Sequence, residues 1–172
     1  MSKNNIKGIL ITSPITNISN KGRVIKLLKS SSDIMFIIDS LYGVKFYEEI
    51  ASENNLKINI LIDCDIMGIG KNKIIRTGAK NIKEIIDLAS LININKNLIY
   101  MGITAYAGDV QHINNYNSRE IETSVRHRYL KNIIETLNKV NLRPLIVSGG
   151  GTGSYNIDTE SKLVTELQTG SY

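Results

Sequence analysis

Residues 148–155, SGGGTGSY, place four glycines directly after the apolar run Leu145-Ile146-Val147. Backbone N–H groups at the end of a strand, with no Cβ to block approach, form a concavity suited to a phosphate, and Ser148 and Thr152 add hydroxyls. The alternative is a flexible glycine-rich turn. The segment lacks the Gly-Lys-Ser/Thr of a P-loop, and no ribose-binding acid follows at the spacing of a dinucleotide fingerprint.

Polar or glycine residues follow several apolar runs of the chain. These clusters are Thr12-Ser13, Asp39-Ser40, Asp63-Cys64-Asp65, residues 106–109 and, as described above, residues 148–150. In a βα barrel such strand ends all open onto one face, which is the usual site of chemistry. In an open sheet, only the strands at the switch point surround a ligand.

The elements that must position these residues alternate along the chain. Continuous apolar runs predict strands over residues 8–13, 33–39, 57–65, 98–106, 145–148 and 162–168. Helical spacing of apolar residues predicts helices over 20–29, 81–91 and 117–140, and another that Ser40 caps and that continues through Ala51. Asn117 with Glu120 resembles a capping box. The apolar stripe expected on the long helix comprises Ile121, Val125, Ile133, Leu137 and Val140.

This alternation predicts an α/β protein with a parallel sheet covered by helices. Periodicity alone does not separate an open, doubly wound sheet from a barrel, but the polar strand ends favour the barrel. A complete barrel typically needs about 250 residues. Six strands in 172 residues therefore indicate either an open sheet or an incomplete barrel.

Composition limits the class of protein. The net charge is +5, but the lysines are scattered singly, so a biased composition is favoured over nucleic-acid binding. No apolar run is long enough to span a bilayer, and the N-terminus lacks a signal-peptide pattern. The single cysteine, Cys64, excludes an internal disulfide and fits a reducing compartment. We therefore expect a cytoplasmic protein without membrane or nucleic-acid partners.

The glycine-rich motifs, taken together with other segments, resemble one enzyme family. VSGGGTGSY (147–155), TELQTGSY (165–172), AYAGDVQH (105–112), and IDCD (62–65) followed by RTGA (76–79) are similar to motifs of the D-threonine aldolase / D-serine dehydratase family. That family is a branch of the alanine racemase-like, fold-type III enzymes that use pyridoxal 5′-phosphate (PLP). The resemblance covers almost the whole chain and implies the TIM-like barrel of alanine racemases, represented here by about strands 3–8.

The resemblance also implies the residues that contact the cofactor. They are Arg76, Tyr106, Ser148, Gly149, Gly150, Gly151, Thr152, Gln168, Gly170, Ser171 and Tyr172. The two glycine-rich loops would hold the phosphate, Gln168 would face the pyridine nitrogen, and Arg76 would face the phenolic oxygen. Lys71 is the competing cation for that last role. Tyr106 would line the pocket, with an ordinary strand-end tyrosine as the alternative.

Several features depart from the family. Asp109 stands where the family usually has His, which puts substrate preference in doubt. The Schiff-base lysine, the strand that carries it and the C-terminal β domain with its metal ligands have no counterpart in the chain. His112, His127 and Cys64 do not have the spacing of a metal site, His127 is expected to be solvated, and His112 has no assigned role.

We therefore expect residues 1–172 to form a partial PLP-binding barrel domain. It would be a portion of a D-threonine aldolase-like or D-serine dehydratase-like lyase acting on a D-3-hydroxy amino acid, with a divalent metal bound outside this chain. It is not expected to be active alone, and it would associate as a homodimer or with a complementing chain. A truncation, a split gene and a degenerate, non-catalytic homologue that binds PLP or phosphate remain alternatives. An unrelated βα protein that binds a phosphosugar or nucleotide is a further alternative.

Overall fold

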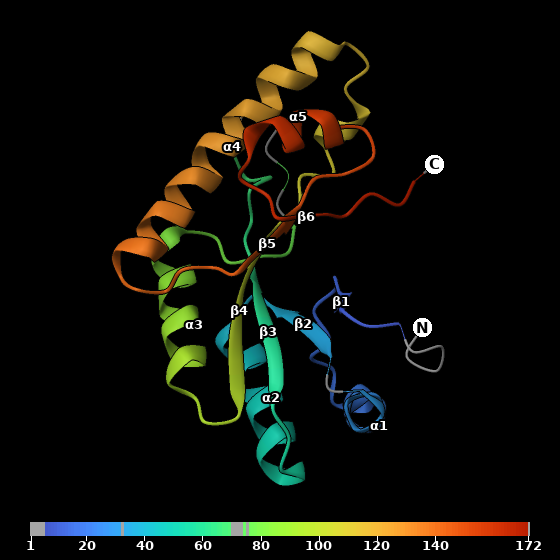
Figure 1. Ribbon diagram of the computed structural model, residues 1–172, viewed down its shortest axis with the longest axis vertical. Coiled ribbons are helices and arrows are strands. Elements are labelled where there is room, and N and C mark those ends of the chain that lie inside the picture. The colour runs from blue at the N-terminus through green and yellow to red at the C-terminus, as the bar shows by residue number, and fades with distance from the viewer. Residues whose placement is uncertain (1–5, 32, 70–73, 75, 172) are drawn as a thin grey trace.

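The computed structural model describes residues 6–31, 33–69, 74 and 76–171, and its strands form one parallel, curled sheet (Figure 1). The strands are β1 (Ile9–Ile11), β2 (Ile34–Ile38), β3 (Ile58–Asp63), β4 (Leu98–Ala105), β5 (Ile146–Gly149) and β6 (Glu166–Leu167). Their order in the sheet is β1-β2-β3-β4-β5-β6, so each strand pairs with the next along the chain. This order has no reversal among the described strands, as in a barrel. The prediction of an incomplete parallel βα barrel is thus confirmed, and the open doubly wound sheet is excluded.

Helices connect the strands and cover one face of the sheet. They are α1 (Lys21–Ser30), α2 (Leu41–Asn54), α3 (Ile82–Ile94), α4 (Tyr116–Lys139) and α5 (Tyr155–Ser161), with short 3-10 helices η2 (Ile18–Asn20) and η3 (Val110–His112). Figure 1 shows α3 and α4 along one side of the sheet and both termini on the other. No helix in the described part of the chain is both long and apolar enough to cross a membrane. Sequence periodicity predicted the four longer α-helices and missed the short α5.

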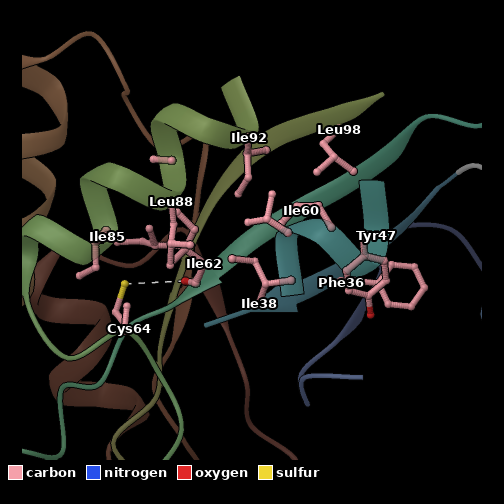
Figure 2. Packing of buried hydrophobic residues seen from close by; sticks show 14 of the residues in the cluster. Phe36, Ile38, Tyr47, Ile60, Ile62, Cys64, Ile85, Leu88, Ile92 and Leu98 are labelled. Carbon is pink, nitrogen blue, oxygen red and sulfur yellow. Dashed lines mark hydrogen bonds between the residues drawn. The ribbon is translucent and has the colours of Figure 1, made fainter. Parts of the chain in front are cut away.

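The main core lies between the helices and the sheet. Figure 2 shows Ile60 and Ile62 of β3 packed against Leu88 and Ile92 of α3. Side chains on the opposite face of the strands form a smaller cluster of Met35, Ile37 and Leu61, with Leu10, Met101 and Ile146 packed against it. Because both faces of the central strands are buried, their sequences are continuously apolar rather than alternating.

Helix α2 begins as predicted, whereas α4 differs from the expectation. The hydroxyl of Ser40 accepts a hydrogen bond from the Gly43 amide at 3.4 Å, so Ser40 is the N-cap of α2. The N-cap of α4 is Asn115 rather than Asn117, because the helix starts at Tyr116 and the Asn115 side chain accepts from the Ser118 amide at 2.9 Å. The prediction of a capping box at Asn117 is therefore wrong.

The buried face of α4 also differs from the predicted stripe. Ile121 is 63% exposed and Val140 is 44% exposed. The residues buried against the protein are Thr123, Arg126, Leu130, Ile133 and Leu137, spaced alternately three and four apart. The true stripe therefore includes a polar residue and a charged residue, which a purely apolar pattern passes over.

Candidate functional site

A cavity of about 480 Å³ opens at the carboxyl ends of the strands. Its described polar lining comprises Thr12, Ser13, Asp63, Asp65, Arg76, Thr77, Thr104, Tyr106, Glu166, Gln168 and Thr169. These residues follow or end β1, β3, β4 and β6, because parallel strands bring their carboxyl ends to one edge. The expectation that polar strand ends meet on one face is confirmed for these strands.

Arg76 and Tyr106 meet within this cavity. The guanidinium carbon of Arg76 lies 5.9 Å from the centroid of the Tyr106 ring, which is within the range of a cation–π contact. The phenol oxygen of Tyr106 accepts a hydrogen bond from Gln111 Nε2 at 2.5 Å. The same Gln111 side chain accepts from the Gly153 amide at 3.2 Å, so it links Tyr106 to the glycine-rich loop. The competing cation, Lys71, lies outside the described residues.

The glycines after β5 are surrounded by the protein's own atoms. A Cβ on Gly149 would lie 2.5 Å from the Ala105 carbonyl oxygen, and one on Gly150 would lie 2.8 Å from Asp158 Oδ2. A Cβ on Gly151 would overlap the Gln111 side chain. Gly149 is therefore required by backbone packing and Gly150 by its φ of +68°, whereas the overlap at Gly151 involves only the end of the flexible Gln111 side chain.

Ser148 and Gln168 belong to a hydrogen-bonded row across β5 and β6. The buried hydroxyl of Ser148 donates to Glu166 Oε1 at 2.6 Å and accepts from Gln168 Nε2 at 3.1 Å. The Gln168 backbone N–H donates to the Gly149 carbonyl at 3.0 Å. Gln168 is therefore held at the cavity wall from both its side chain and its backbone.

Thr152 joins the loop after β5 to the loop after β6. Its Oγ1 accepts the backbone N–H groups of Gly170 at 3.2 Å and of Ser171 at 3.0 Å. Two consecutive amides therefore converge on one oxygen atom, an arrangement that suits anion binding. A Cβ on Gly170 would meet no atom within 4 Å, so this side of the loop is open. Tyr172 lies outside the described residues.

Asp63 is a cavity residue that sequence reasoning did not select. It is 7% exposed and accepts a hydrogen bond from Thr104 Oγ1 at 2.8 Å. Burial raises the pKa of the Asp63 carboxyl, while hydrogen bonds from Thr104 and Thr77 partly oppose that rise. Its position as the last residue of an apolar strand was the available signal.

Replacing Asp63 with Asn is expected to stabilise the protein more at about pH 7 than at about pH 3.5. Because the folded-state pKa is raised, the folded protein binds more protons than the unfolded chain in the window between the two pKa values. The stability of the wild type therefore falls as pH rises through that window, whereas Asn carries no such penalty. Urea unfolding at both pH values measures the difference, with the exposed Asp87→Asn as control. A gain independent of pH would contradict the expectation.

A charged cluster lies behind the glycine-rich loop. Arg126 is 1% exposed, and its guanidinium contacts the Asp109 carboxylate. It also donates to Glu122 Oε2 at 3.1 Å. His127 Nε2 lies 2.8 Å from Asp158 Oδ1, and the His127 side chain is only 12% exposed, so the expectation of a solvated His127 is wrong. Its partner Asp158 belongs to α5, an element that the sequence did not reveal. His112 is exposed at the surface.

Comparisons with known proteins agree with the resemblance and the fold. The 3-hydroxy-D-aspartate aldolase of Paracoccus denitrificans (strain Pd 1222) is 27% identical over 171 residues, which are 99% of this chain and 43% of that protein. The D-threonine aldolase of Arthrobacter sp. is 28% identical over 142 residues, covering 81% of this chain and 35% of the relative. No family model matches. The chain thus spans less than half the length of these curated relatives.

Solved structures show the same architecture. The D-threonine aldolase of Filomicrobium marinum matches with a TM-score of 0.88 at 22% identity, covering all of this chain and 45% of that one. The D-threo-3-hydroxyaspartate dehydratase of Delftia sp. HT23 gives 0.84 at 16% identity, covering 98% and 43%. The alanine racemase of Clostridium difficile 630 gives 0.71 at 18% identity, covering 98% and 40%. The alanine racemase-like fold is therefore confirmed, and so is the resemblance to D-threonine aldolase and 3-hydroxy-D-aspartate aldolase.

Proposed function

We propose that this chain carries the PLP-binding part of a lyase, an aldolase or a dehydratase, that acts on D-3-hydroxy amino acids. The proposal rests on the cavity of about 480 Å³ at the strand ends, whose lining includes Arg76, Tyr106 and Gln168, and on the joined loops that follow β5 and β6. The names of the relatives support the substrate class, because two of them are a 3-hydroxy-D-aspartate aldolase and a D-threonine aldolase.

The phosphate of PLP fits the donors of the two loops. The amides of Gly170 and Ser171 already converge on an oxygen atom, that of Thr152, at hydrogen-bonding distance. A phosphate held there would gain these amides together with the Thr152 and Ser171 hydroxyls. The open space beside Gly170 leaves room for an approach that a side chain would block. The tightly packed Gly149 and Gly151 would act by fixing the loop rather than by direct contact.

The remaining groups of the cavity suit the ring of PLP. The fixed positive charge of Arg76 would favour the ionised phenolic oxygen, and the Tyr106 ring below the guanidinium limits where that charge can lie. Gln168 offers the ring nitrogen a neutral amide that leaves it less strongly protonated than a carboxylate would. These residues would bind and orient the cofactor, exclude water and set its charge state.

When bound, PLP supplies an electron sink for cleavage at the α-carbon of an amino acid. The described lining of the cavity contains no lysine that could hold it covalently. We therefore propose that the lysine, and any metal, are held by protein segments beyond the described cavity, and that further strands, one of them carrying the lysine, complete the barrel beside β1 and β6. The described chain would then bind PLP weakly, through its phosphate.

A test of this function is the affinity of the chain for PLP in the Gly170→Val variant. A Cβ at that position meets no protein atom within 4 Å, so the fold is expected to persist while the side chain blocks the phosphate approach. We expect binding to weaken about tenfold or more, as for the loss of hydrogen bonds to a charged group. Equilibrium dialysis measures the change. Gly150→Val is unsuitable, because its Cβ would collide with Asp158 and Leu167.

Gly22→Val on α1 serves as the control, because that glycine also has open space but lies far from the loops in the chain. Inorganic phosphate should compete with PLP for the wild type. Unchanged PLP affinity in Gly170→Val would overturn the assignment of the phosphate site. Equal affinity for phosphate and PLP would instead identify a general phosphate site, without a contribution from Arg76 and Gln168.

A further inference from the structure

The connection between β3 and α3 carries Arg76 and is held at both ends by the Asp65 carboxylate. Asp65 is 8% exposed. Its Oδ1 accepts the amides of Met67 at 3.2 Å and Gly68 at 3.1 Å, which start the connection. Its Oδ2 accepts from Lys80 Nζ at 3.1 Å, near the point where the connection ends. One buried carboxylate therefore binds residues at both ends of this connection.

Lys80 extends this clamp to Arg76 itself. The Lys80 ammonium also donates to the backbone carbonyl of Arg76 at 2.8 Å. The Lys80 side chain is 47% exposed, while its partner carboxylate is 6% exposed, so the charge bridges solvent and a buried acceptor. The hydrogen bond between the Lys80 ammonium and the Asp65 carboxylate joins two charged groups, so it is stronger than a bond between neutral groups.

The backbone just after Arg76 is fixed separately. The Ala79 amide donates to the Asp63 carbonyl at 2.8 Å, and the Asp65 amide donates to the Ala79 carbonyl at 3.1 Å. Gly78 has a φ of +111° and lies so close to Asp65 that a Cβ would reach 2.5 Å from the Asp65 nitrogen. Arg76 lies before this anchored point and after Ile74, whose amide donates to the Met67 carbonyl at 3.3 Å. Between these anchors, Arg76 itself is held by the Lys80 bond and by its contact with the Tyr106 ring.

We propose that Asp65 and Lys80 are positioning residues that set the Arg76 guanidinium over Tyr106. The cofactor-related part of this inference rests on the proposed function, in which Arg76 faces the phenolic oxygen of PLP. Neither Asp65 nor Lys80 needs to touch the cofactor. Their role is to hold the Arg76 backbone at the cavity, through the Asp65–Lys80 pair and the Lys80 bond to the Arg76 carbonyl.

The first experiment follows the loop without any cofactor. In Lys80→Met, the ring-current shift of the Arg76 side-chain resonances should collapse, whereas hydrogen exchange at Ala79 should stay as in the wild type, because its amide donates to the Asp63 carbonyl and not to Lys80. Lys83→Met is the matched control, because Lys83 pairs with Asp87 on the exposed face of the same helix region at 2.6 Å. Lys80→Arg should restore the ring-current shift. Lys80→Gln is the second variant if Lys80→Met does not fold.

The second experiment measures PLP affinity in a double-mutant cycle with Arg76→Met. Lys80→Met should weaken PLP roughly three- to tenfold in the wild-type background and have no further effect once Arg76 is replaced. Additive effects would overturn a role through Arg76. If Lys80→Met leaves the Arg76 resonances as in Lys83→Met, the positioning role fails. Failure of the wild type to bind PLP would refute the proposed function, and the cofactor-free experiment would still decide the clamp.

Discussion

Replacement of Arg126 by Met should lower the free energy of unfolding by about 3–5 kcal/mol, as for a buried ion pair that loses one partner. Arg126 is 1% exposed, and its guanidinium contacts the Asp109 carboxylate, which is itself 8% exposed. Its NH1 group also donates to the Glu122 carbonyl at 2.8 Å and to the Glu122 carboxylate. Met fills a similar volume but leaves the Asp109 charge buried without a partner.

The matched control is Arg128→Met, two residues further along the same helix and exposed to solvent. Its effect should remain within about 0.5 kcal/mol. Urea unfolding followed by circular dichroism gives both values. The double variant Arg126→Met with Asp109→Leu should regain part of the loss, because it removes the unpaired charge as well. Equal effects of Arg126→Met and Arg128→Met would show that the buried pair does not support the fold.

This cluster changes the interpretation of Asp109. The acid at this position departs from the family pattern, which suggested an effect on substrate preference. In the fold, the Asp109 carboxylate binds Arg126 of α4, and Asp109 is not among the described residues that line the cavity. The acid therefore has a partner within the chain. Any influence on substrate would act through the segment that joins Tyr106 to Gln111.

The order of strands and helices was predictable from the sequence. Burial on both faces makes parallel strands continuously apolar, whereas each helix has apolar residues at helical spacing on one face and polar residues on the other. The choice between a barrel and an open sheet could not be predicted from periodicity, because it depends on which strands are neighbours in the sheet. The polar strand ends favoured the correct answer because the ends of parallel strands must meet. The buried Arg126 face of α4 escaped detection, because a charged residue enters a core only when its partner, here Asp109, arrives from another segment.

In the candidate site too, some residues could be found from the sequence and others only from the fold. Arg76, Tyr106 and Gln168 stand at strand ends or carry a family motif, so sequence patterns located them. Lys80 gains its role only from two acceptors, Asp65 and the Arg76 carbonyl, that folding brings to its ammonium. The run of glycines illustrates the limit most directly. Sequence suggested a ligand as the reason for Gly149 and Gly151, whereas the fold places protein atoms there and leaves Gly170 as the open position.

Gly102→Ala should destabilise the protein by roughly 3–5 kcal/mol, combining backbone strain with an overlap that cannot relax. The pairing of β3 with β4 shifts between Ile60 and Leu61, so that Met101 is an extra residue in β4. Gly102, directly after this bulge, has a φ of +144°, and its Cβ would overlap the backbone carbonyl oxygen of Ile146. Unlike the end of a flexible side chain, a strand carbonyl cannot move aside without displacing β5.

Displacement of β5 would extend to the candidate site, because Ser148 and Gly149 lie at its carboxyl end. Hydrogen exchange in Gly102→Ala should therefore accelerate in β5 and in the loop that carries Thr152, while α2 retains its protection. Gly22→Ala on α1 is the control, because that glycine has open space and a helical position where Ala is favoured by about 1 kcal/mol. Similar stabilities for the two variants would show that β4 and β5 approach less closely than the Gly102–Ile146 contact requires.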